Sequence, residues 1–302
     1  MKNVKRKSPK SSGSILRATA RSKKISSATK KKIVIRKAGH TPVYEIYALK
    51  NCGPMPRKLA RFAANAEWNE DWEITYYLWL IKGQGKAIVV DTGVGPTLAK
   101  KRDVTNYVDA VDVLAEMGVN GLNLTTVILT HFHFDHFGGM ETFPHAFPKA
   151  KFYMQKKEFD FWTKHPFAKK PSFYEYGGNE LATIKAVVDL KGTGRLVLVR
   201  GDQKIMPGIE VLLSPGHTIG LQTVAVNTEK GTAIIASDGL SMKRCFTEDS
   251  PPAFQTTDLI ACHETYDKLR AKATSEALVF AGHEVTPAGD YPRVSANVTR
   301  LI

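Results

Sequence analysis

The chain has 302 residues, which suffice for one large domain or two small ones and exclude a large multidomain assembly. Its composition, 43% hydrophobic and 9% aromatic, is that of an ordinary globular protein, and no apolar run reaches the ~18 residues of a membrane-spanning helix. The formal net charge is +14, but residues 1–37 hold 14 Lys and Arg and no acid, so the remaining residues carry 29 basic and 29 acidic side chains. This body is neutral, and its composition does not favour nucleic-acid binding.

Residues 1–33 consist mainly of Ser, Lys, Arg, Thr and Ala with isolated hydrophobic residues. Such a segment offers too little apolar surface to offset the entropy of ordering it, so we expect a disordered basic tail. Three roles stay open for this tail: a solubilising extension, a contact with nucleic acid or an anionic membrane surface, and an organelle transit peptide.

Deletion of residues 1–33 is expected to leave the kcat and the Tm of the protein nearly unchanged, because this segment cannot add to the hydrophobic core. Turnover and thermal unfolding of the full-length and shortened proteins test this prediction. A Tm that falls by several degrees after the deletion would show that the tail docks on the body.

Short β-type runs alternate with helical runs from Val43 onward, and together they predict one α/β domain over residues 34–302. Strands are expected at residues 43–49, 74–81, 87–90, 126–129, 151–154, 196–199, 209–213, 223–226, 232–236 and 278–281. Helices are expected at residues 104–117, 156–164 and 258–272, the first and last of which carry an apolar face.

The three cysteines, Cys52, Cys245 and Cys262, are odd in number, far apart and outside any CxxC spacing. They argue against a disulfide framework and against a thiolate zinc site. This use of cysteine predicts a reducing compartment, and we expect the protein in the cytoplasm.

The segment THFHFDHFGG follows the strand expected at residues 126–129 and carries four ligand-type side chains within six residues. His131 and His133 are two residues apart, so in extended backbone both side chains point the same way and reach one cation. Asp135 and His136 come at the following turn, where they can face a second cation. Packing alone does not explain four such groups together, because each would need a buried partner.

Three more ligand-type residues each follow a β-type run and have a glycine nearby, which lets the chain turn. They are His217 in SPGHTIG, Asp238 in ASDG and His283 in AGHE. Imidazole and carboxylate ligands suit zinc and similar divalent transition metals, and seven ligands are enough for two zinc ions. We predict the following arrangement: His131, His133 and His217 on one ion, Asp135, His136 and His283 on the other, and Asp238 bridging them.

From about Val43 to the C-terminus, the HxHxDH motif with its later His, Asp and His clearly resembles the metallo-β-lactamase superfamily. The resemblance implies a four-layer αβ/βα sandwich with the metals at the sheet edges. Asp91, in the DTG segment after the third expected strand, matches an early aspartate of the superfamily. The resemblance gives this residue a structural role, in which it ties loops together beneath the metal site.

Within the superfamily, this chain has Asp238 rather than a cysteine at the second-metal position. In this respect it resembles the hydrolase branch that includes glyoxalase II and the lactonases. The intervals of 21 residues from His217 to Asp238 and 45 residues from Asp238 to His283 are more similar to N-acyl homoserine lactonases. The segments TYYLWLIK and PGHTIG also resemble that family. Its members commonly carry a Tyr three residues after the bridging Asp, where this chain has Ser241, so we expect a different lactone or an ester as substrate.

The predicted chemistry is the hydrolysis of a lactone or ester at a dinuclear metal site. Two cations lower the pKa of a shared water, so that a hydroxide attacks the carbonyl near neutral pH, and Asp135 is the candidate that passes a proton to the departing alkoxide. No covalent protein nucleophile is required. The group that polarises the carbonyl is left open between a metal ion and four tyrosines, Tyr77, Tyr153, Tyr174 and Tyr176.

Two alternatives stay open, a thioester hydrolase of the glyoxalase II type and an RNA-processing nuclease of the same superfamily. The nuclease is disfavoured because such members usually need an extra domain or a long arm between these motifs, and neither fits this chain. The expected partner is a small lactone or ester. Nucleic acid is not required, no membrane span is expected, and a homodimer is left open.

Residues 143–176 hold 11 of the 28 aromatic side chains, far more than an even distribution would place there. The stretch lies between the HxHxDH motif and His217, where the family often inserts a substrate cap. It therefore predicts either a cap that binds an apolar or aromatic group of the substrate, or a mixture of core and dimer interface.

Overall fold

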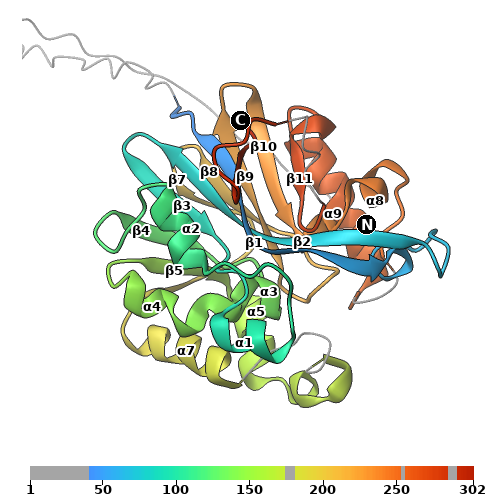
Figure 1. Cartoon of the computed structure of the whole chain (residues 1–302), viewed down its shortest axis with the longest axis horizontal. Helices are drawn as coiled ribbons and strands as arrows, with labels where there is room; N and C mark the ends of the chain where they lie inside the picture. The colour runs from blue at the N-terminus through green and yellow to red at the C-terminus, as the bar shows by residue number, and fades with distance from the viewer. Residues whose placement is uncertain (1–40, 174–180, 253–255, 285–290) are drawn as a thin grey trace, which may run out of the picture. The chain divides into compact units, whose positions relative to one another are not determined.

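The computed structural model describes residues 41–173, 181–252, 256–284 and 291–302 (Figure 1). The expected basic tail and the tyrosines Tyr174 and Tyr176 lie outside these ranges. The strands of the described part are β1 (Glu45–Lys58), β2 (Asp71–Gly83), β3 (Lys86–Val90), β4 (Leu124–Ile128), β5 (Lys151–Gln155), β6 (Leu196–Val199), β7 (Gln203–Met206), β8 (Ile209–Leu213), β9 (Gln222–Thr228), β10 (Gly231–Ser237), β11 (Val279–Ala281) and β12 (Val298–Arg300). The α-helices are α1 (Pro96–Lys101), α2 (Ala110–Glu116), α3 (Phe134–Phe137), α4 (Phe143–Ala146), α5 (Lys156–Lys164), α7 (Leu181–Gly192), α8 (Lys243–Thr247) and α9 (Leu259–Lys272).

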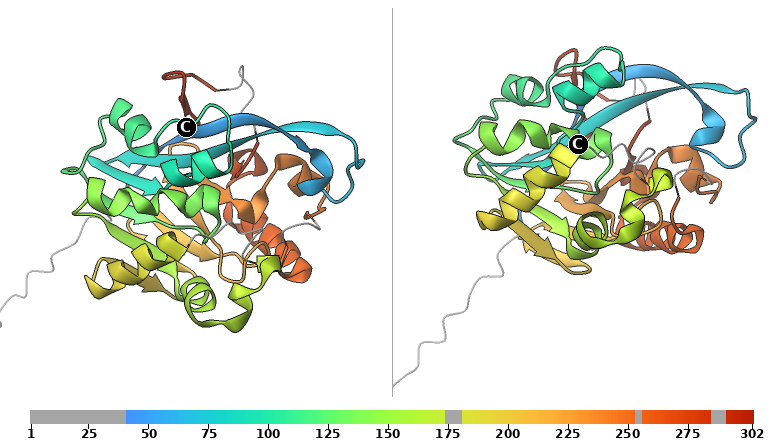
Figure 2. Two further views of the ribbon diagram at one scale, coloured as in Figure 1. Left: turned by 60° about the horizontal axis from the view of Figure 1, so that its bottom comes forward. Right: turned by 90° about the horizontal axis from the view of Figure 1, so that it is seen from below.

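Two sheets form the centre of the fold. The first has the order β12-β1-β2-β3-β4-β5-β6 and the second the order β11-β10-β9-β8-β7. In the first sheet β1, β2 and β3 pair antiparallel, whereas β3 to β6 pair parallel. Helices α2, α5 and α7 cover the outer face of the first sheet, and α8 and α9 cover the outer face of the second (Figures 1 and 2).

Alternation along the strands produces these layers, because successive side chains of a strand point to opposite faces. In β2, Leu78 packs toward the helices and Trp79 packs between the two sheets. In β10, Ile234 faces α9 and Ile235 faces the first sheet. Each sheet is thus buried on both faces, which confirms the expected four-layer sandwich.

All ten expected strands are present, nine of them with shifts of at most three residues at their ends, whereas β1 extends to Lys58, nine residues beyond its expected end. The helices expected at 156–164 and 258–272 are α5 and α9. The short strands β7 and β12 and several short helices were not expected. The helix expected at 104–117 is wrong at its start, since α2 begins at Ala110. Residues before it bond to β1 instead: Gly53 N–H donates to the Thr105 carbonyl at 2.8 Å, and Asp109 caps α2 by accepting from Val111 N–H at 2.8 Å.

The aromatic segment is mostly hydrophobic core. Its buried members join one cluster beneath the first sheet, namely Phe143, Phe147, Phe152, Phe159, Phe161 and Trp162. Phe167 is exposed. The core interpretation is therefore confirmed for the described part of this segment, and the cap interpretation is not supported by it.

Cys52, Cys245 and Cys262 are free and buried. Burial raises the pKa of the Cys52 and Cys245 thiols to about 12, so these thiols stay protonated. Among the described residues, none of the helices has the length and apolar character needed to cross a bilayer.

Candidate metal centre

The seven predicted ligands meet where strands of both sheets end. The chain leaves β4 at Ile128, is extended at His133 and turns there into α3, whose first turn carries Asp135 and His136. His217 and His283 follow β8 and β11, and Asp238 begins the short 3-10 helix that follows β10. All seven side chains are buried, and none is more than 9% exposed.

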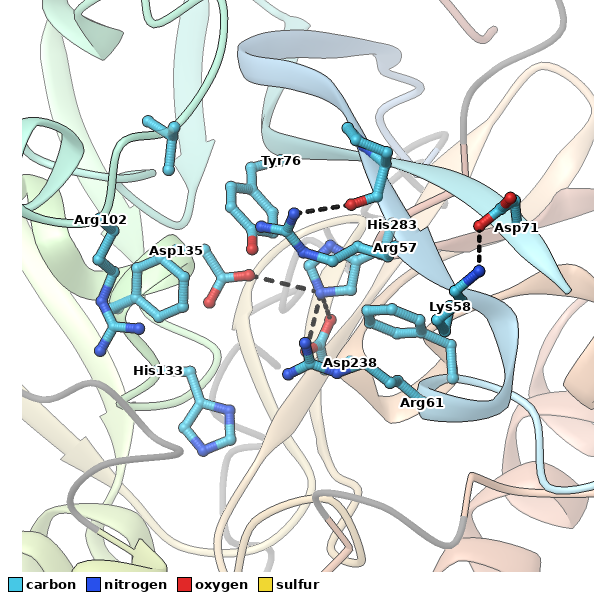
Figure 3. A pocket seen from close by; sticks show the side chains of 14 residues that line it. Arg57, Lys58, Arg61, Asp71, Tyr76, Arg102, His133, Asp135, Asp238 and His283 are labelled. Carbon is cyan, nitrogen blue, oxygen red and sulfur yellow. Dashed lines mark hydrogen bonds and ion pairs between the residues drawn. The ribbon is translucent and has the colours of Figure 1, made fainter. Parts of the chain in front are cut away.

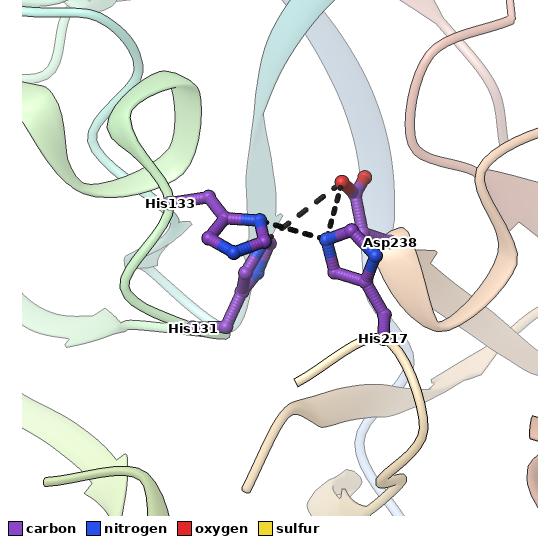
Figure 4. A group of neighbouring side chains, drawn as sticks. All are labelled: His131, His133, His217 and Asp238. Atoms are coloured by element: carbon purple, nitrogen blue, oxygen red, sulfur yellow. Dashed lines mark hydrogen bonds and ion pairs between the residues drawn. The ribbon is translucent and has the colours of Figure 1, made fainter. Parts of the chain in front are cut away.

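The first group consists of His131, His133, His217 and Asp238 (Figure 4). The Nδ1 atom of His133 lies 2.8 Å from Nε2 of His217, and the latter lies 3.2 Å from Oδ2 of Asp238. Nε2 of His131 lies 3.9 Å from the same carboxylate oxygen. One ligand atom from each of the four residues falls within 4.8 Å of the others, which is a separation that one metal ion can span.

The second group consists of Asp135, His136, His283 and again Asp238. Oδ2 of Asp135 lies 3.5 Å from Nε2 of both His136 and His283. Oδ1 of Asp238 lies 2.9 Å from Nε2 of His283 and 3.3 Å from Nε2 of His136. Oδ2 of Asp238, which lies 3.2 Å from Nε2 of His217, is also 3.1 Å from Nε2 of His283, so this carboxylate borders both groups, as a bridging ligand requires.

Unpartnered buried atoms support metal binding at both groups. Nε2 of His131 and Nε2 of His136 are buried without a hydrogen bond in the described part of the chain, and so is Nδ1 of His217. A buried polar atom without a hydrogen bond costs about 1–3 kcal/mol, and the two Nε2 atoms face the Asp238 carboxylate at 3.9 and 3.3 Å, where a metal ion can become their partner. Nitrogen and carboxylate donors suit zinc and similar divalent ions, and the residues present thus fit two metal ions.

The protonation states of the first group also suit a metal. Burial lowers the pKa of His131 well below its usual range, and the neighbouring imidazoles add to this effect. Burial likewise lowers the pKa of His133 to about 3, with a further contribution from His217. Both imidazoles are therefore neutral near pH 7, which is the form that binds metal.

The second group balances carboxylates against imidazoles. Burial disfavours ionisation of Asp135, but His136 and His283 outweigh it and lower the pKa of this carboxyl. Burial also disfavours a charge on His136, yet Asp238 and Asp135 outweigh it and raise the pKa of this imidazole. In the metal-free protein, protons on the imidazoles thus compensate the carboxylates, and a bound cation would displace them.

Asp91 supports both groups from beneath, in the structural role that the family resemblance implies. Its carboxylate accepts from Thr130 N–H at 2.7 Å and lies 2.8 Å from Nδ1 of His136. Ser237, which precedes Asp238, has an unusual positive φ of 48° and donates to Asp91 at 3.2 Å. Such backbone strain persists only where the surroundings hold it, and here it directs the Asp238 carboxylate into the site.

Glu158 is a second supporting residue, and the sequence analysis missed it. This fully buried carboxylate on α5 accepts from Phe132 N–H at 3.1 Å and from the Trp162 indole at 2.8 Å. It also accepts from the Thr218 hydroxyl at 2.9 Å and from Gly220 N–H at 2.8 Å. Glu158 therefore joins the segment that carries His131 and His133 to the loop that carries His217. Nothing in the charged stretch KKEFDF indicates this role.

A cavity of about 710 Å³ opens onto His133, Asp135, Asp238 and His283 (Figure 3). Tyr76 lines it and packs against the rings of Phe134 and His283, at 5.5 and 5.4 Å between ring centres.

Tyr76 is not one of the four tyrosines considered from the sequence. Its neighbour Tyr77 points to the opposite face of β2 and packs between the sheets, and Tyr153 packs against the same cluster. Neither lines the cavity in the described part of the chain, so both are wrong as candidates for polarising the carbonyl. Burial and the Asp135 charge raise the pKa of Tyr76, which keeps its hydroxyl protonated.

Four cationic side chains, Arg57, Lys58, Arg61 and Arg102, also line the cavity (Figure 3). They come from the end of β1, the turn after it and the residue after α1. The neutral overall charge of the body conceals this concentration, and no motif in the sequence indicates it.

Comparisons with known proteins agree with this geometry. A family model described as the metallo-beta-lactamase superfamily matches residues 75–283. An N-acyl homoserine lactonase from a Bacillus species is 24% identical over 229 residues, covering 70% of this chain and 82% of that protein. A hydroxyacylglutathione hydrolase from Methylobacillus flagellatus is 29% identical over 148 residues, covering 48% of this chain and 40% of that protein.

Among solved structures, AidC, a dizinc quorum-quenching lactonase in complex with a product, superimposes with a TM-score of 0.63. The match covers 85% of this chain and 93% of that one at 18% sequence identity, which shows a common fold. The family match spans well over half of the chain and includes all seven clustered residues. This chain therefore belongs to the metallo-beta-lactamase superfamily of metal-dependent hydrolases.

Proposed function

We propose that the protein is a dinuclear metal-dependent hydrolase that opens a lactone or cleaves an ester of a small molecule. The observation that carries the proposal is the pair of ligand groups that share Asp238 at the floor of a cavity. His131, His133, His217 and Asp238 would hold one ion, and Asp135, His136, His283 and Asp238 the other. Zinc is the metal we propose, since the donors are imidazole nitrogens and carboxylate oxygens and a structural neighbour is dizinc.

Bound divalent ions supply a Lewis acid for the carbonyl and lower the pKa of a water toward neutrality. Around them, Tyr76 turns a protonated hydroxyl into the cavity, where it donates to the carbonyl oxygen as negative charge develops there. Asp135 lines the same cavity, accepts the proton of the attacking water and returns it to the departing oxygen. We propose no role for the hydroxyl of Ser241, because this residue is buried and is not among the described residues that line the cavity.

The substrate panel that tests this function contains a γ-lactone, a δ-lactone, an aryl ester, an aryl thioester and hexanoyl homoserine lactone. We expect the zinc-loaded protein to hydrolyse a lactone or ester, a chelator to abolish turnover and added zinc to restore it. The Asp238→Asn variant serves as the inactive control. If the zinc-loaded protein hydrolyses none of the substrates in the panel, the proposal is refuted.

Hexanoyl homoserine lactone is expected to be a poor substrate, because Ser241 replaces the tyrosine that such lactonases commonly carry. A lactone or ester with an aromatic group should be at least about tenfold better in kcat/KM, since Phe62 and Phe134 line the cavity. The aromatic segment adds no support for this preference, because most of its described aromatic residues belong to the core.

The Tyr76→Phe variant is expected to lower kcat by about 10²-fold, the usual cost of one lost hydrogen-bond donor to a developing oxyanion. The matched control is Tyr77→Phe, which removes a hydroxyl from the adjacent residue on the opposite face of β2. Steady-state kinetics on the best panel substrate compare the two variants. Equal rates for both would assign the polarisation of the carbonyl to the metal alone.

A thioester hydrolase remains the second candidate, since a relative 29% identical over 148 residues is a hydroxyacylglutathione hydrolase. Preferential cleavage of a glutathione thioester over the lactones and esters of the panel would move the assignment to this activity.

A further inference from the structure

The cationic side chains of the cavity are concentrated beyond what the composition predicts. Residues 38–302 carry equal numbers of basic and acidic side chains, yet Arg57, Lys58, Arg61 and Arg102 surround a single cavity. Three of them lie within five positions of the chain, at residues 57–61, and Arg102 joins them from the segment after α1 (Figure 3). The fold thus produces a positive surface at the entrance to the ligand groups.

Two of these cations have no acidic partner in the described part of the chain. Arg57 donates to the Pro56 carbonyl at 2.8 Å and to the Met55 sulfur at 3.8 Å, and it also hydrogen-bonds to the Tyr76 hydroxyl. The Arg102 guanidinium lies 4.0 Å from the centre of the Phe134 ring. Lys58, in contrast, pairs with Asp71 at 2.6 Å. No carboxylate of the described residues thus neutralises Arg57 or Arg102, and both keep their positive charge for an anion.

The carboxylates at the floor of the cavity do not neutralise these arginines. Asp135 and Asp238 form their ion pairs with imidazoles of the ligand groups. Their charges are therefore used within the ligand groups, and the guanidinium groups of Arg57 and Arg102 stay positive toward the cavity, where they favour a negatively charged ligand.

We propose that the substrate carries an anionic group, a carboxylate or a phosphate, which Arg57 and Arg102 bind while its scissile ester or lactone lies at Asp135 and Tyr76. This inference rests on the proposed function and adds the class of its substrate. Phe62, Phe134 and Val104 line the same cavity and provide apolar contacts for the part of the substrate between its two polar ends. Guanidinium groups suit this role, because they bind carboxylate and phosphate oxygens through paired hydrogen bonds.

The test uses three acetate esters with the same scissile bond and a group on the opposite side of the ring: 4-acetoxybenzoate, 4-acetoxyphenylphosphonate and the neutral 4-acetoxybenzamide. Each kcat/KM is divided by the rate of hydroxide-catalysed hydrolysis of the same ester, which removes intrinsic reactivity. At low salt we expect the normalised kcat/KM of at least one anionic ester to be about tenfold higher than that of the neutral 4-acetoxybenzamide. This ratio should become smaller at high ionic strength, because salt screens the attraction between charges. The better of the two anionic esters distinguishes a carboxylate site from a phosphate site.

The double variant Arg57→Gln, Arg102→Gln is expected to lower kcat/KM for the anionic ester at least fivefold more than for the amide, mainly through KM. The double variant Arg57→Lys, Arg102→Lys should retain part of the preference, since it keeps both charges. The control is Arg200→Gln, which removes an exposed arginine outside the cavity and should change neither value. If the glutamine double variant lowers kcat/KM equally for the anionic ester and for 4-acetoxybenzamide, the inference is overturned.

Binding without turnover supplies a second measurement, which separates this inference from the proposed function. Calorimetry compares benzoate, phenylphosphonate and benzamide on the zinc-loaded and on the metal-free protein. Tighter binding of an anion that is lost in the glutamine double variant supports the inference even if no ester is hydrolysed. If the unmodified protein binds neither anion more tightly than benzamide, the inference is overturned. It is also overturned if the glutamine double variant still binds an anion more tightly than benzamide. If the variant instead loses binding of a single-stranded RNA while small anions bind no better than benzamide, the cavity entrance serves nucleic acid.

Discussion

Replacement of Asp238 by Asn is expected to remove both metal ions and to lower kcat/KM by more than the roughly 10–100-fold that the loss of an outer-sphere partner costs. The reason is geometric, since one oxygen of Asp238 lies 3.2 Å from Nε2 of His217 and the other 2.9 Å from Nε2 of His283. An amide keeps the shape of the side chain but replaces one oxygen by a nitrogen that cannot bind metal. Elemental analysis should find two ions per chain in the unmodified protein and fewer than one in this variant.

The His217→Ala variant separates the two groups, because His217 belongs to the first group alone. It should retain one ion per chain, held by Asp135, His136, His283 and Asp238. Asp267→Ala removes an exposed carboxylate on α9 and serves as the control, with two ions and full activity. If the Asp238→Asn protein still binds two ions with unchanged affinity, Asp238 is not a shared ligand.

Replacement of Glu158 by Ala is expected to destabilise the fold by at least ~3 kcal/mol, because it leaves several buried donors without an acceptor. It should also weaken metal binding at the first group by about 10–100-fold, since the two segments that carry His133 and His217 lose their common anchor. Urea unfolding measures the first effect, and competition with a chelator measures the second. The Glu158→Gln variant, which keeps one carbonyl oxygen, should fall between Ala and the unmodified protein in both.

The matched control is Glu264→Ala, which removes an exposed glutamate from α9 and should change the free energy of unfolding by no more than about 0.5 kcal/mol. A Glu158→Ala protein with the chelator resistance of the unmodified protein would mean that other contacts position the histidines. The free energy of unfolding of the Glu158→Ala protein would then show how far water replaces the lost hydrogen-bond acceptor.

The fold was predictable in outline because most of its strands have a buried stretch, which appears in the sequence as a compact apolar run. Prediction was less successful where tertiary contacts overrule local pattern. Residues 104–108 continue the apolar periodicity of α2, but their backbone groups bond to β1, as in the 2.8 Å bond from Val108 N–H to the Asn51 carbonyl. The aromatic segment also has the composition of a binding surface, and only its packing beneath the first sheet identifies it as core.

The candidate site was predictable where its chemistry is local. Four ligand-type residues within six positions need no tertiary structure to suggest a metal, and His217, Asp238 and His283 each follow a recognisable strand. Glu158 and Tyr76 carried no comparable signal. Glu158 is one acid in a charged helix, and the choice between Tyr76 and Tyr77 depends on which face of β2 borders the cavity.

The order of residues alone determined the family, the layered α/β fold and the seven clustered side chains, because each depends on periodicity and on spacing along a short stretch of chain. Tertiary structure decided which groups surround those side chains. Arg57 and Arg102 lie 45 positions apart and line one cavity only because folding brings the end of β1 and the end of α1 to it. Charge composition sums over the whole chain, whereas a substrate responds to the charges within a few ångströms of it, and only folding sets those distances.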